Sequence, residues 1–274
     1  RNRGDRNIAN EKRKLRRIKM KYFDTHAHYN DEKYDGILED TLKRCKEANV
    51  KYIINVGYNK ESSKKAIKFS YDYDYMYSAI GVHPHDVNKD NAVDIYDLYN
   101  QNVNKKIVAI GEIGLDYAFV KDNKKEQEKL FISQIELANT LKLPVIIHTR
   151  DASFDTYQVL RNNKPHYGLL FHCFHPTDDL VNMVLENGYT VAFGGNITYK
   201  RNNSFGNYMK KIPITQIVIE TDSPYLPPEP YRGTINASYN LPIICKKLSE
   251  YLQIDNETLN EQLFINSKRF FNIK

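Results

Sequence analysis

Short apolar runs alternate with longer amphipathic segments along the chain from about Tyr22 onward. Several short runs, such as IVAI and PVIIH, are almost continuously apolar, which is typical of parallel strands buried on both faces. We predict eight strands, over residues 21–24, 52–56, 76–80, 107–111, 144–148, 169–172, 190–193 and 216–221. We predict helices over residues 36–48, 62–71, 93–99, 125–141, 155–161, 178–186, 204–210, 241–251 and 257–271.

Strand and helix patterns that alternate eight times predict an α/β fold, a TIM barrel with eight parallel strands and outer helices. The alternative is an open doubly wound sheet, which usually carries a Gly-rich phosphate loop after a strand. No GxGxxG sequence follows any predicted strand, and the glycines of GEIGLDY are spaced differently. The pattern therefore favours the barrel.

The net charge of +6 is concentrated at one end of the chain. Residues 1–21 carry ten Lys or Arg and two Asp or Glu, whereas the rest carries 30 basic and 32 acidic residues. We expect residues 1–21 to form a flexible basic arm and residues 22–274 to form a single barrel domain. A solvated tail is the favoured interpretation of the arm; a nucleic-acid contact, a targeting signal and a linker are the alternatives.

Composition narrows the protein class only slightly. Hydrophobic residues make up 41% and charged residues 27% of the chain, ordinary values for a globular protein. No stretch approaches the roughly 18 apolar residues of a membrane span. We therefore expect no membrane association, and no obligate protein partner is evident. Three scattered cysteines and a start at Arg1, where we expect an upstream segment to be missing, leave cytoplasmic (the default), nuclear and secreted locations open.

Seven of the eight histidines lie at or just beyond predicted strand ends, which barrel closure would gather into one bowl. The first strand ends in DTHAH, where His26 and His28 are two residues apart and point to the same side. Such a pair can hold one metal ion. Asp24, in step with them, is expected to point inward and to accept a proton from a ligand ring.

Carboxylates and further imidazoles follow later strands. Glu112 comes directly after the fourth apolar run, His148 ends the fifth run and His172 ends the sixth. Glu220 and Asp222 share one side of the eighth strand. A carboxylate inside an apolar strand is costly to bury unless it is paired or bound to a cation.

This set supplies enough ligands for two metal ions, with positions left for water. Two ions about 3.5–4 Å apart can clamp the attacking and leaving oxygens of an ester that is hydrolysed. We expect Glu112 to bridge the ions, and Asp222 to bind one ion and handle the proton of the attacking water. These two carboxylates are the predicted catalytic residues.

Seven sequence blocks in chain order resemble the TatD family of metal-dependent deoxyribonucleases. They are DTHAHYN, GVHPH, IGEIGLDY, PVIIHTRDA, LLFHCF, IETDSPYL and PYRG. The resemblance runs from about Tyr22 to the C-terminus and leaves out the basic arm. It implies a distorted TIM barrel of the amidohydrolase superfamily, a centre of two metal ions and hydrolysis of DNA phosphodiester bonds.

The family pattern also implies roles for particular residues. It implies that one metal is held by His26, His28, Glu112 and Asp222. It implies that the other is held by Glu112, His148 and His172. It implies that the substrate phosphate is faced by His83, Arg150 and Arg232.

Two departures from the family pattern affect this carry-over. His175 and Pro176 follow HCF where the family usually has Ser-Gly, which we expect to alter metal preference or narrow the groove. Ala237 and Ser238 stand where the family tends to have Glu-Pro, which we expect to change the loop that orders Arg232.

The cofactor is expected to be two divalent ions per chain. Imidazoles suit zinc, manganese or iron better than magnesium, which prefers oxygen. The resemblance points instead to magnesium-supported activity, so we expect Mg²⁺ or Mn²⁺ in the active enzyme and keep Zn²⁺ as an alternative.

DNA is the expected substrate, with exonuclease preference for single-stranded ends, because a concave bowl admits a strand end more easily than an intact duplex. The rim cations expected to attract it are Arg150, Lys200, Arg201 and Arg232. Four tyrosines follow strand ends or lie in rim loops, where stacking on unpaired bases and packing within the loop are both open: Tyr117, Tyr199, Tyr225 and Tyr231.

Two other functions remain open from the sequence. The first is an amidohydrolase-type hydrolase of a small phosphoester or amide, although Glu112 stands where many of those barrels carry a carboxylated lysine. The second is a DNA-binding barrel without catalysis, which has no need of six convergent metal ligands.

Overall fold

The computed structural model describes residues 20–102, 106–118 and 122–274. Within them, one sheet of eight parallel strands runs in the order β1 to β8, so that each strand pairs with the next along the chain. The strands are β1 Tyr22–Ala27, β2 Val50–Val56, β3 Met76–Ile80, β4 Ile107–Asp116, β5 Val145–Arg150, β6 Leu169–Phe171, β7 Thr190–Phe193 and β8 Ile217–Ile219. This sequential order confirms the predicted TIM barrel over the open doubly wound sheet.

The barrel closes between β8 and β1 by few backbone contacts. A single parallel bridge joins Ala27 to Ser223, and the amide of His28 donates to the carbonyl of Ser223 at 2.6 Å. The amide of Asp222 donates to the carbonyl of His26 at 2.9 Å. The seam is therefore made mostly by the segment after β8, which is how the barrel is distorted.

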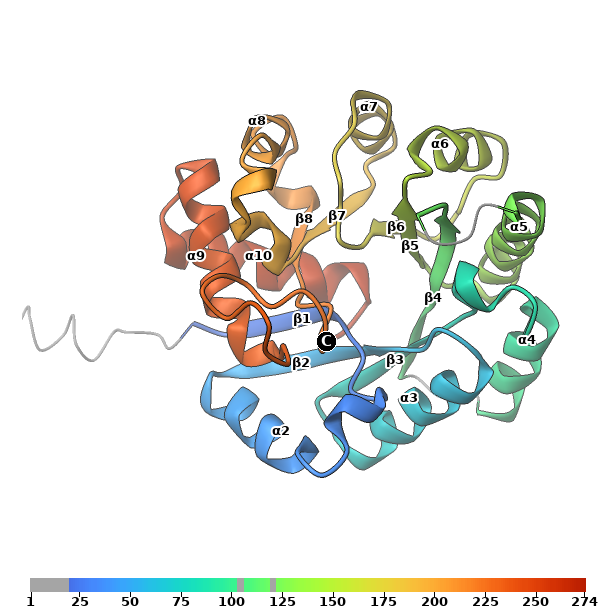
Figure 1. The fold of residues 1–274 in the computed structure, drawn as a ribbon, viewed down its shortest axis with the longest axis horizontal. Coiled ribbons are helices and arrows are strands. Elements are labelled where there is room, and N and C mark those ends of the chain that lie inside the picture. The colour runs from blue at the N-terminus through green and yellow to red at the C-terminus, as the bar shows by residue number, and fades with distance from the viewer. Residues whose placement is uncertain (1–19, 103–105, 119–121) are drawn as a thin grey trace, which may run out of the picture.

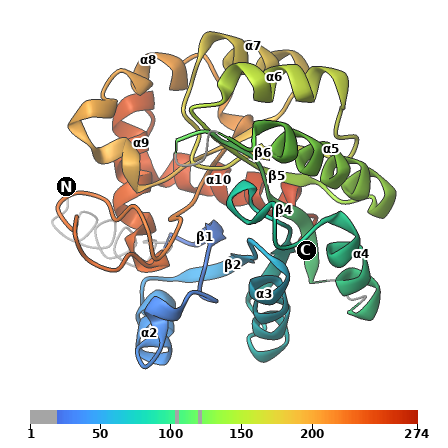
Figure 2. The ribbon, with the colours of Figure 1, turned by 45° about the vertical axis from the view of Figure 1, so that its right-hand side comes forward.

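Helices surround the ring of strands on its outside (Figures 1 and 2). They are α2 Leu38–Glu47, α3 Lys60–Asp72, α4 Ala92–Gln101, α5 Lys124–Leu141, α6 Ser153–Asn162, α7 Asp178–Asn187, α8 Phe205–Met209, α9 Leu241–Leu252 and α10 Asn256–Phe270. Side-chain caps fix where some of them begin. Asn59 before α3 and Asn91 before α4 each form a capping box with the third residue of the helix.

The barrel interior is apolar at the end where the strands begin. Phe23, Ile54 and Ile146 belong to one buried cluster inside the ring, together with Phe271 and Ile273 from the C-terminal end. The rings of Phe23 and Phe271 stack with centroids 5.9 Å apart. The chain end thus plugs this side of the barrel, and the polar chemistry is confined to the opposite end.

Several strands continue past the point where their apolar runs stop. The fourth was predicted to end at residue 111, but β4 extends to Asp116, and Gly114 and Asp116 pair with His148 and Arg150 of β5. The first was predicted to end at residue 24, but β1 extends to Ala27. The polar residues there are buried ligand candidates that stay inside the ladder, so a rule based on apolar runs ends these strands too early.

The predicted basic arm lies outside the described residues, apart from Met20 and Lys21. Met20 already contacts the fold, because its carbonyl accepts a hydrogen bond from Asn49 at 2.7 Å. None of the helices in the described part of the chain is long and apolar enough to cross a membrane.

Candidate metal centre

Four imidazoles and two carboxylates meet at the carboxyl end of the barrel. They come from β1, β4 and β5 and from the residues that follow β1, β6 and β8. The six are His26, His28, Glu112, His148, His172 and Asp222. The structure therefore brings together every residue predicted as a metal ligand, in overlapping clusters, one of which consists of His83, Asp116 and His148. The contacts of Glu112 divide the six into two groups, with His26, His28 and Asp222 on one side and His148 and His172 on the other.

The first group consists of His26, His28, Asp222 and one oxygen of Glu112. The Nε2 atoms of the two histidines are 3.1 Å apart. From these nitrogens, Glu112 Oε2 lies 3.5 and 3.7 Å away and Asp222 Oδ1 lies 3.7 and 3.4 Å away. Four ligands placed tetrahedrally at 2.0–2.1 Å from one ion would be about 3.4 Å apart. The spacing therefore matches one ion at the centre of the group.

The second group consists of His148, His172 and the other oxygen of Glu112. Glu112 Oε1 lies 2.8 Å from His148 Nδ1 and 2.7 Å from His172 Nε2, and the two nitrogens are 3.1 Å apart. Each Glu112 oxygen therefore faces a different group, and this carboxylate joins the two groups.

Hydrogen bonds on the far side of the rings decide which nitrogens carry protons. His28 Nδ1 lies 2.8 Å from the carbonyl oxygen of Val56, which can only accept, so Nδ1 carries the hydrogen. His148 Nε2 lies 3.0 Å from Asp116 Oδ2, so that nitrogen also donates. The neutral rings then present bare nitrogen lone pairs to Glu112 and Asp222.

His172 Nδ1 lies 3.4 Å from Glu220 Oε1, a contact between ionisable groups in which this nitrogen has no hydrogen-bond partner among the described residues. The neutral His148 ring turns a lone pair toward Glu112 Oε1 at 2.8 Å, and His172 Nε2 lies 2.7 Å from the same oxygen. Such a contact repels unless a cation or extra protons lie there. A divalent ion would attract both the imidazole nitrogens and the carboxylate, and these donor types suit such an ion.

Charge inside the centre shifts several pKa values strongly. Burial alone raises the pKa of Glu112, but the nearby His172 and His83 and hydrogen bonds from His148 and His172 outweigh it and hold that pKa well below its usual range. Burial lowers the pKa of His172, but Glu112 and Glu220 outweigh it and raise that pKa well above the ordinary value. The centre therefore keeps Glu112 ionised and attracts positive charge.

Two of the three predicted substrate contacts lie beside these groups. His83 Nδ1 accepts from the amide of His85 at 3.1 Å, so its Nε2 carries the hydrogen and lies 3.8 Å from Glu112 Oε1. Burial, with His148 nearby, lowers the pKa of His83 well below its ordinary value and keeps the ring neutral. Arg150 lines the pocket next to the ligands.

Arg232, the third predicted contact, is not among the residues that line this pocket. Its guanidinium carbon lies 4.4 Å above the centroid of the Tyr199 ring. Arg201, which the sequence placed only among the rim cations, lines the pocket instead.

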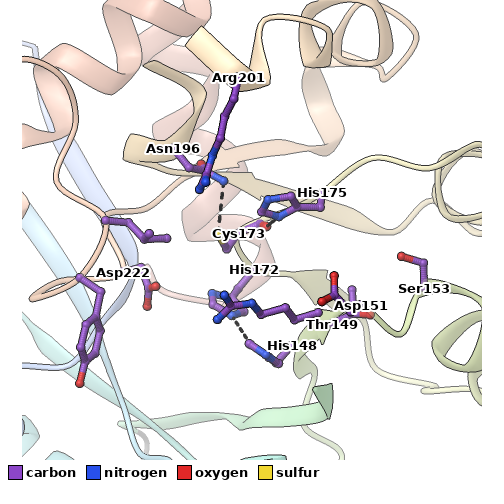
Figure 3. A pocket seen from close by; sticks show the side chains of 13 residues that line it. His148, Thr149, Asp151, Ser153, His172, Cys173, His175, Asn196, Arg201 and Asp222 are labelled. Atoms are coloured by element: carbon purple, nitrogen blue, oxygen red, sulfur yellow. Dashed lines mark hydrogen bonds between the residues drawn. The ribbon is translucent and has the colours of Figure 1, made fainter. Parts of the chain in front are cut away.

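The pocket is open beside His148, His172 and Asp222 and has a volume of about 470 Å³ (Figure 3). Its remaining lining residues are Thr149, Arg150, Asp151, Ser153, Cys173, His175, Asn196, Arg201, Tyr225 and Leu226. Among the six ligand candidates, Asp222 is the carboxylate that faces it. Asp222 adopts a left-handed backbone conformation, φ 56°, which aspartate tolerates better than most residues.

The prediction for Asp24 is wrong in detail. Its carboxylate accepts from the amide and hydroxyl of Thr221 at 2.9 and 2.6 Å and from the Ser238 hydroxyl at 2.6 Å, and none of its side-chain bonds reaches an imidazole. A register irregularity between Asp24 and Ala27 breaks the two-residue alternation. Burial raises the pKa of Asp24 to about 7 in spite of these hydrogen bonds. Glu220, by contrast, lies behind His172, on the side away from Glu112.

For two of the four tyrosines, the structure favours packing within the fold over stacking on a base. Tyr117 and Tyr199 are buried, with 6% and 3% of their surface exposed, so neither offers a free ring face to a base. Tyr225 and Tyr231 are exposed, although Lys33 covers one face of the Tyr225 ring at 4.2 Å.

Sequence reasoning missed Asp116. Its Oδ2 accepts from His148 Nε2 at 3.0 Å and lies 3.1 Å from His85 Nε2. The signal was present, because Asp116 lies four residues after Glu112 and therefore on the same side of a strand that continues. Ending the strand at residue 111 hid that relation.

The fold and the centre define a parallel barrel with chemistry at the carboxyl ends of its strands and ligands for metal ions. The sequence model of the family described as TatD related DNase matches residues 23–272. The chain belongs to this family, which confirms the resemblance seen in the sequence.

Similar proteins agree with this assignment. The chain is 34% identical over 252 residues to the uncharacterized metal-dependent hydrolase YabD of Bacillus subtilis, covering 92% of this chain and 99% of that protein. It is 30% identical to the uncharacterized metal-dependent hydrolase YcfH of Escherichia coli, covering 84% and 86%. Its fold matches the crystal structure of YJJV, a TatD homologue of Escherichia coli, with a TM-score of 0.87, 26% identity and coverage of 94% and 100%. The chain thus belongs to a family of metal-dependent hydrolases.

Proposed function

We propose that this protein is a metal-dependent deoxyribonuclease that uses two divalent ions to hydrolyse DNA phosphodiester bonds. The observation that carries the proposal is the position of Glu112. Its two oxygens lie 2.7–2.8 Å from the nitrogens of one imidazole pair and 3.5–3.7 Å from those of the other. The family membership and the names of the relatives support the same class of reaction.

The position of each residue suggests its role in the proposed reaction. When bound, two such ions supply Lewis-acid activation of water and of the phosphate oxygens. Asp222 is the ligand carboxylate on the pocket side, so it is placed to take the proton of the attacking water. The Nε2–H of His83 and the guanidinium of Arg150 are placed to donate to phosphate oxygens, and both keep these donors near neutral pH.

The ligand set accommodates Mg²⁺ or Mn²⁺ in the active enzyme and Zn²⁺ as an alternative. Imidazole nitrogens favour the softer ions, whereas the shared carboxylate suits all three. The spacing of the first group fits four ligands, and the second group has three protein ligands with room on the pocket side. Open coordination positions are what a catalytic site needs.

The shape of the site favours a strand end as substrate. The ligands lie in a bowl at the carboxyl end of the barrel, next to a pocket of about 470 Å³, which is the size of a small-molecule site and far smaller than a duplex. We propose exonuclease action on single-stranded or frayed ends. Equal cleavage rates on a closed circular duplex and on a linear single strand would refute this preference.

The pocket volume is also compatible with a second function, the hydrolysis of a small phosphoester or amide. A carboxylate bridge supports chemistry on either substrate class, and the pocket size suits a small molecule. A DNA-binding barrel without catalysis receives less support, because six converging ligands serve no purpose in a pure binder.

One experiment separates the three functions. The purified protein is stripped with a chelator, then assayed on single-stranded DNA, on a small phosphodiester and on an amide, with and without added Mg²⁺ or Mn²⁺. We expect DNA cleavage to disappear on stripping and to return with either metal. Undiminished cleavage by metal-free protein, or turnover of the small substrates alone, would contradict the proposal.

A further inference from the structure

The pocket beside the metal ligands contains a cation whose hydrogen-bond donors are not used by a neighbouring carboxylate. Arg201 lies on the short 3-10 helix Lys200–Asn202 and extends from the pocket rim toward Asn196 and Cys173 (Figure 3). Among the ion pairs of residues 20–102, 106–118 and 122–274, none involves Arg201. Its N–H groups are therefore available to a ligand in the pocket.

The ring of Tyr199 holds Arg201 at this wall. The guanidinium carbon of Arg201 lies 5.8 Å from the centroid of the Tyr199 ring, and the Tyr199 hydroxyl donates to the carbonyl of Pro227 at 2.9 Å. Contact with an aromatic face uses the plane of a guanidinium and leaves its N–H groups free. Arg201 is therefore oriented without losing its donors.

A second observation at the same wall also points to a ligand. Asn196 is 3% exposed, and its Nδ2 donates to Cys173 Sγ at 3.4 Å. Its Oδ1 has no hydrogen-bond partner among the described residues. Buried polar atoms are rarely left in this state unless a ligand or water completes the bonding.

The pocket offers two cationic side chains to a polyanionic substrate. Its charged lining residues are Arg150 and Arg201 against Asp151 and Asp222, and Asp222 is one of the ligand candidates, whose charge a bound metal ion would offset. His175, on the same wall, donates from Nδ1 to the carbonyl of Cys173 at 2.9 Å, which fixes its ring against the pocket. Arg201 is thus a second cation of this pocket besides Arg150, beside Asn196 in Figure 3.

We propose that Arg201 binds the DNA phosphate next to the scissile one, so that this pocket is a subsite for the neighbouring nucleotide of a single strand. This inference rests on the proposed function. The scissile phosphate lies at the ligands and Arg150, and the adjacent phosphate lies against Arg201, with Asn196 and His175 forming the wall. Arg201, rather than Arg232, is then the substrate contact on this side.

The test removes the charge of one phosphate at a time. A thymidine trinucleotide with two linkages is prepared with a neutral methylphosphonate in place of the first linkage, or in place of the second. Cleavage of the remaining phosphodiester is followed with the metal-loaded wild-type protein and with Arg201→Ala, Arg201→Lys and Lys210→Ala. Lys210 is the matched control, because it is an exposed cation just after α8 that does not line the pocket.

For the wild type, one of the two neutral substitutions should lower kcat/KM by about tenfold or more, mainly through KM, as loss of a charge-assisted hydrogen bond predicts. Arg201→Ala should lose this sensitivity, Arg201→Lys should keep part of it, and Lys210→Ala should keep all of it. The subsite is wrong if Arg201→Ala keeps the full sensitivity, or if the wild type cleaves both modified strands as fast as the unmodified one. If no single strand is cleaved at all, the proposed function itself fails.

Discussion

The two halves of the metal centre share Glu112 but obtain their negative charge in different ways. The first half adds a second carboxylate directly, Asp222, whose Oδ1 lies 3.4 Å from His28. In the second half, Glu112 is the one carboxylate among the candidate ligands. Carboxylates lie behind its imidazoles instead: Asp116 accepts a hydrogen bond from His148, and Glu220 lies 3.4 Å from His172 Nδ1 without a hydrogen bond.

A charged and a neutral acceptor behind a ligand histidine affect its basicity differently. His28 donates to a backbone carbonyl, that of Val56, and His26 Nδ1 has no hydrogen-bond partner among the described residues. A carboxylate behind an imidazole raises the basicity of the ligand and fixes its orientation. The metal affinity of the first half should therefore depend on the charges of its own ligands. That of the second half should depend also on the carboxylates behind its histidines.

The largest effect should come from Glu112→Gln, the change that touches both halves. The amide keeps the shape but removes the charge that offsets two divalent ions, so at least one ion should be lost. We expect kcat to fall by about a hundredfold or more, with a smaller change in DNA binding. Metal content and single-strand cleavage rate are the measurements, with Glu186→Gln on the exposed end of α7 as control. Two tightly bound metals and near-normal turnover in Glu112→Gln would disprove the bridge.

Asp222→Asn should damage the first half alone. It removes a ligand charge and the proposed proton acceptor, so we expect kcat to fall by about a hundredfold while the second half keeps its ion. His28→Ala should be milder, because it removes one neutral ligand. Metal content and the pre-steady-state rate check this, and Glu229→Gln is the matched control on the exposed loop after β8. If Asp222→Asn lost both ions, the halves would not be separable.

Asp116→Asn should weaken the second half from a distance. The amide still reaches His148 but carries no charge, so we expect metal affinity of this half to fall by about 10–100-fold, with recovery of rate at high metal concentration. Competition with a chelator measures this. Asp151→Asn is a strict control, because Asp151 is an exposed carboxylate of the same pocket. Equal affinities in the two variants would show that backing carboxylates do not set the strength of this half.

Removal of residues 1–19 should have the smallest effect. The barrel and both halves are built from later residues, so turnover and metal content should stay unchanged. If the arm contacts DNA, its loss should reduce the slope of binding against salt concentration, because fewer counterions are released. An unchanged slope supports the solvated-tail interpretation. A loss of bound metal on truncation would contradict the independence of the centre from the arm.

Most of the fold was predictable because buried parallel strands are nearly continuous apolar runs. β3 and β7 begin and end where the sequence predicted. β1, β4 and β5 run further, because polar residues occupy their last positions, buried in β1 and β4 and half-buried or exposed in β5, and an apolar pattern cannot recognise them. The seam between β8 and β1 was not predictable, since it depends on the turn around Asp222.

The ligand candidates were predictable because six residues of suitable type follow strand ends. Their neighbours were harder to predict. Asp24 turns away at a register irregularity, and Asp116 was hidden by the extension of β4. Both Arg201 and Arg232 lie near the Tyr199 ring, but only Arg201 lines the pocket. The folded loops decide which of the two arginines reaches the pocket, and the sequence pattern does not show this.

The central claim is that two ions joined by Glu112 perform the hydrolysis. The most direct test is a metal titration of chelator-stripped protein in which bound metal per chain and single-strand DNA cleavage are measured on the same samples. We predict that cleavage stays low through the first equivalent and rises with the second. Full cleavage with one ion or none per chain would contradict the claim.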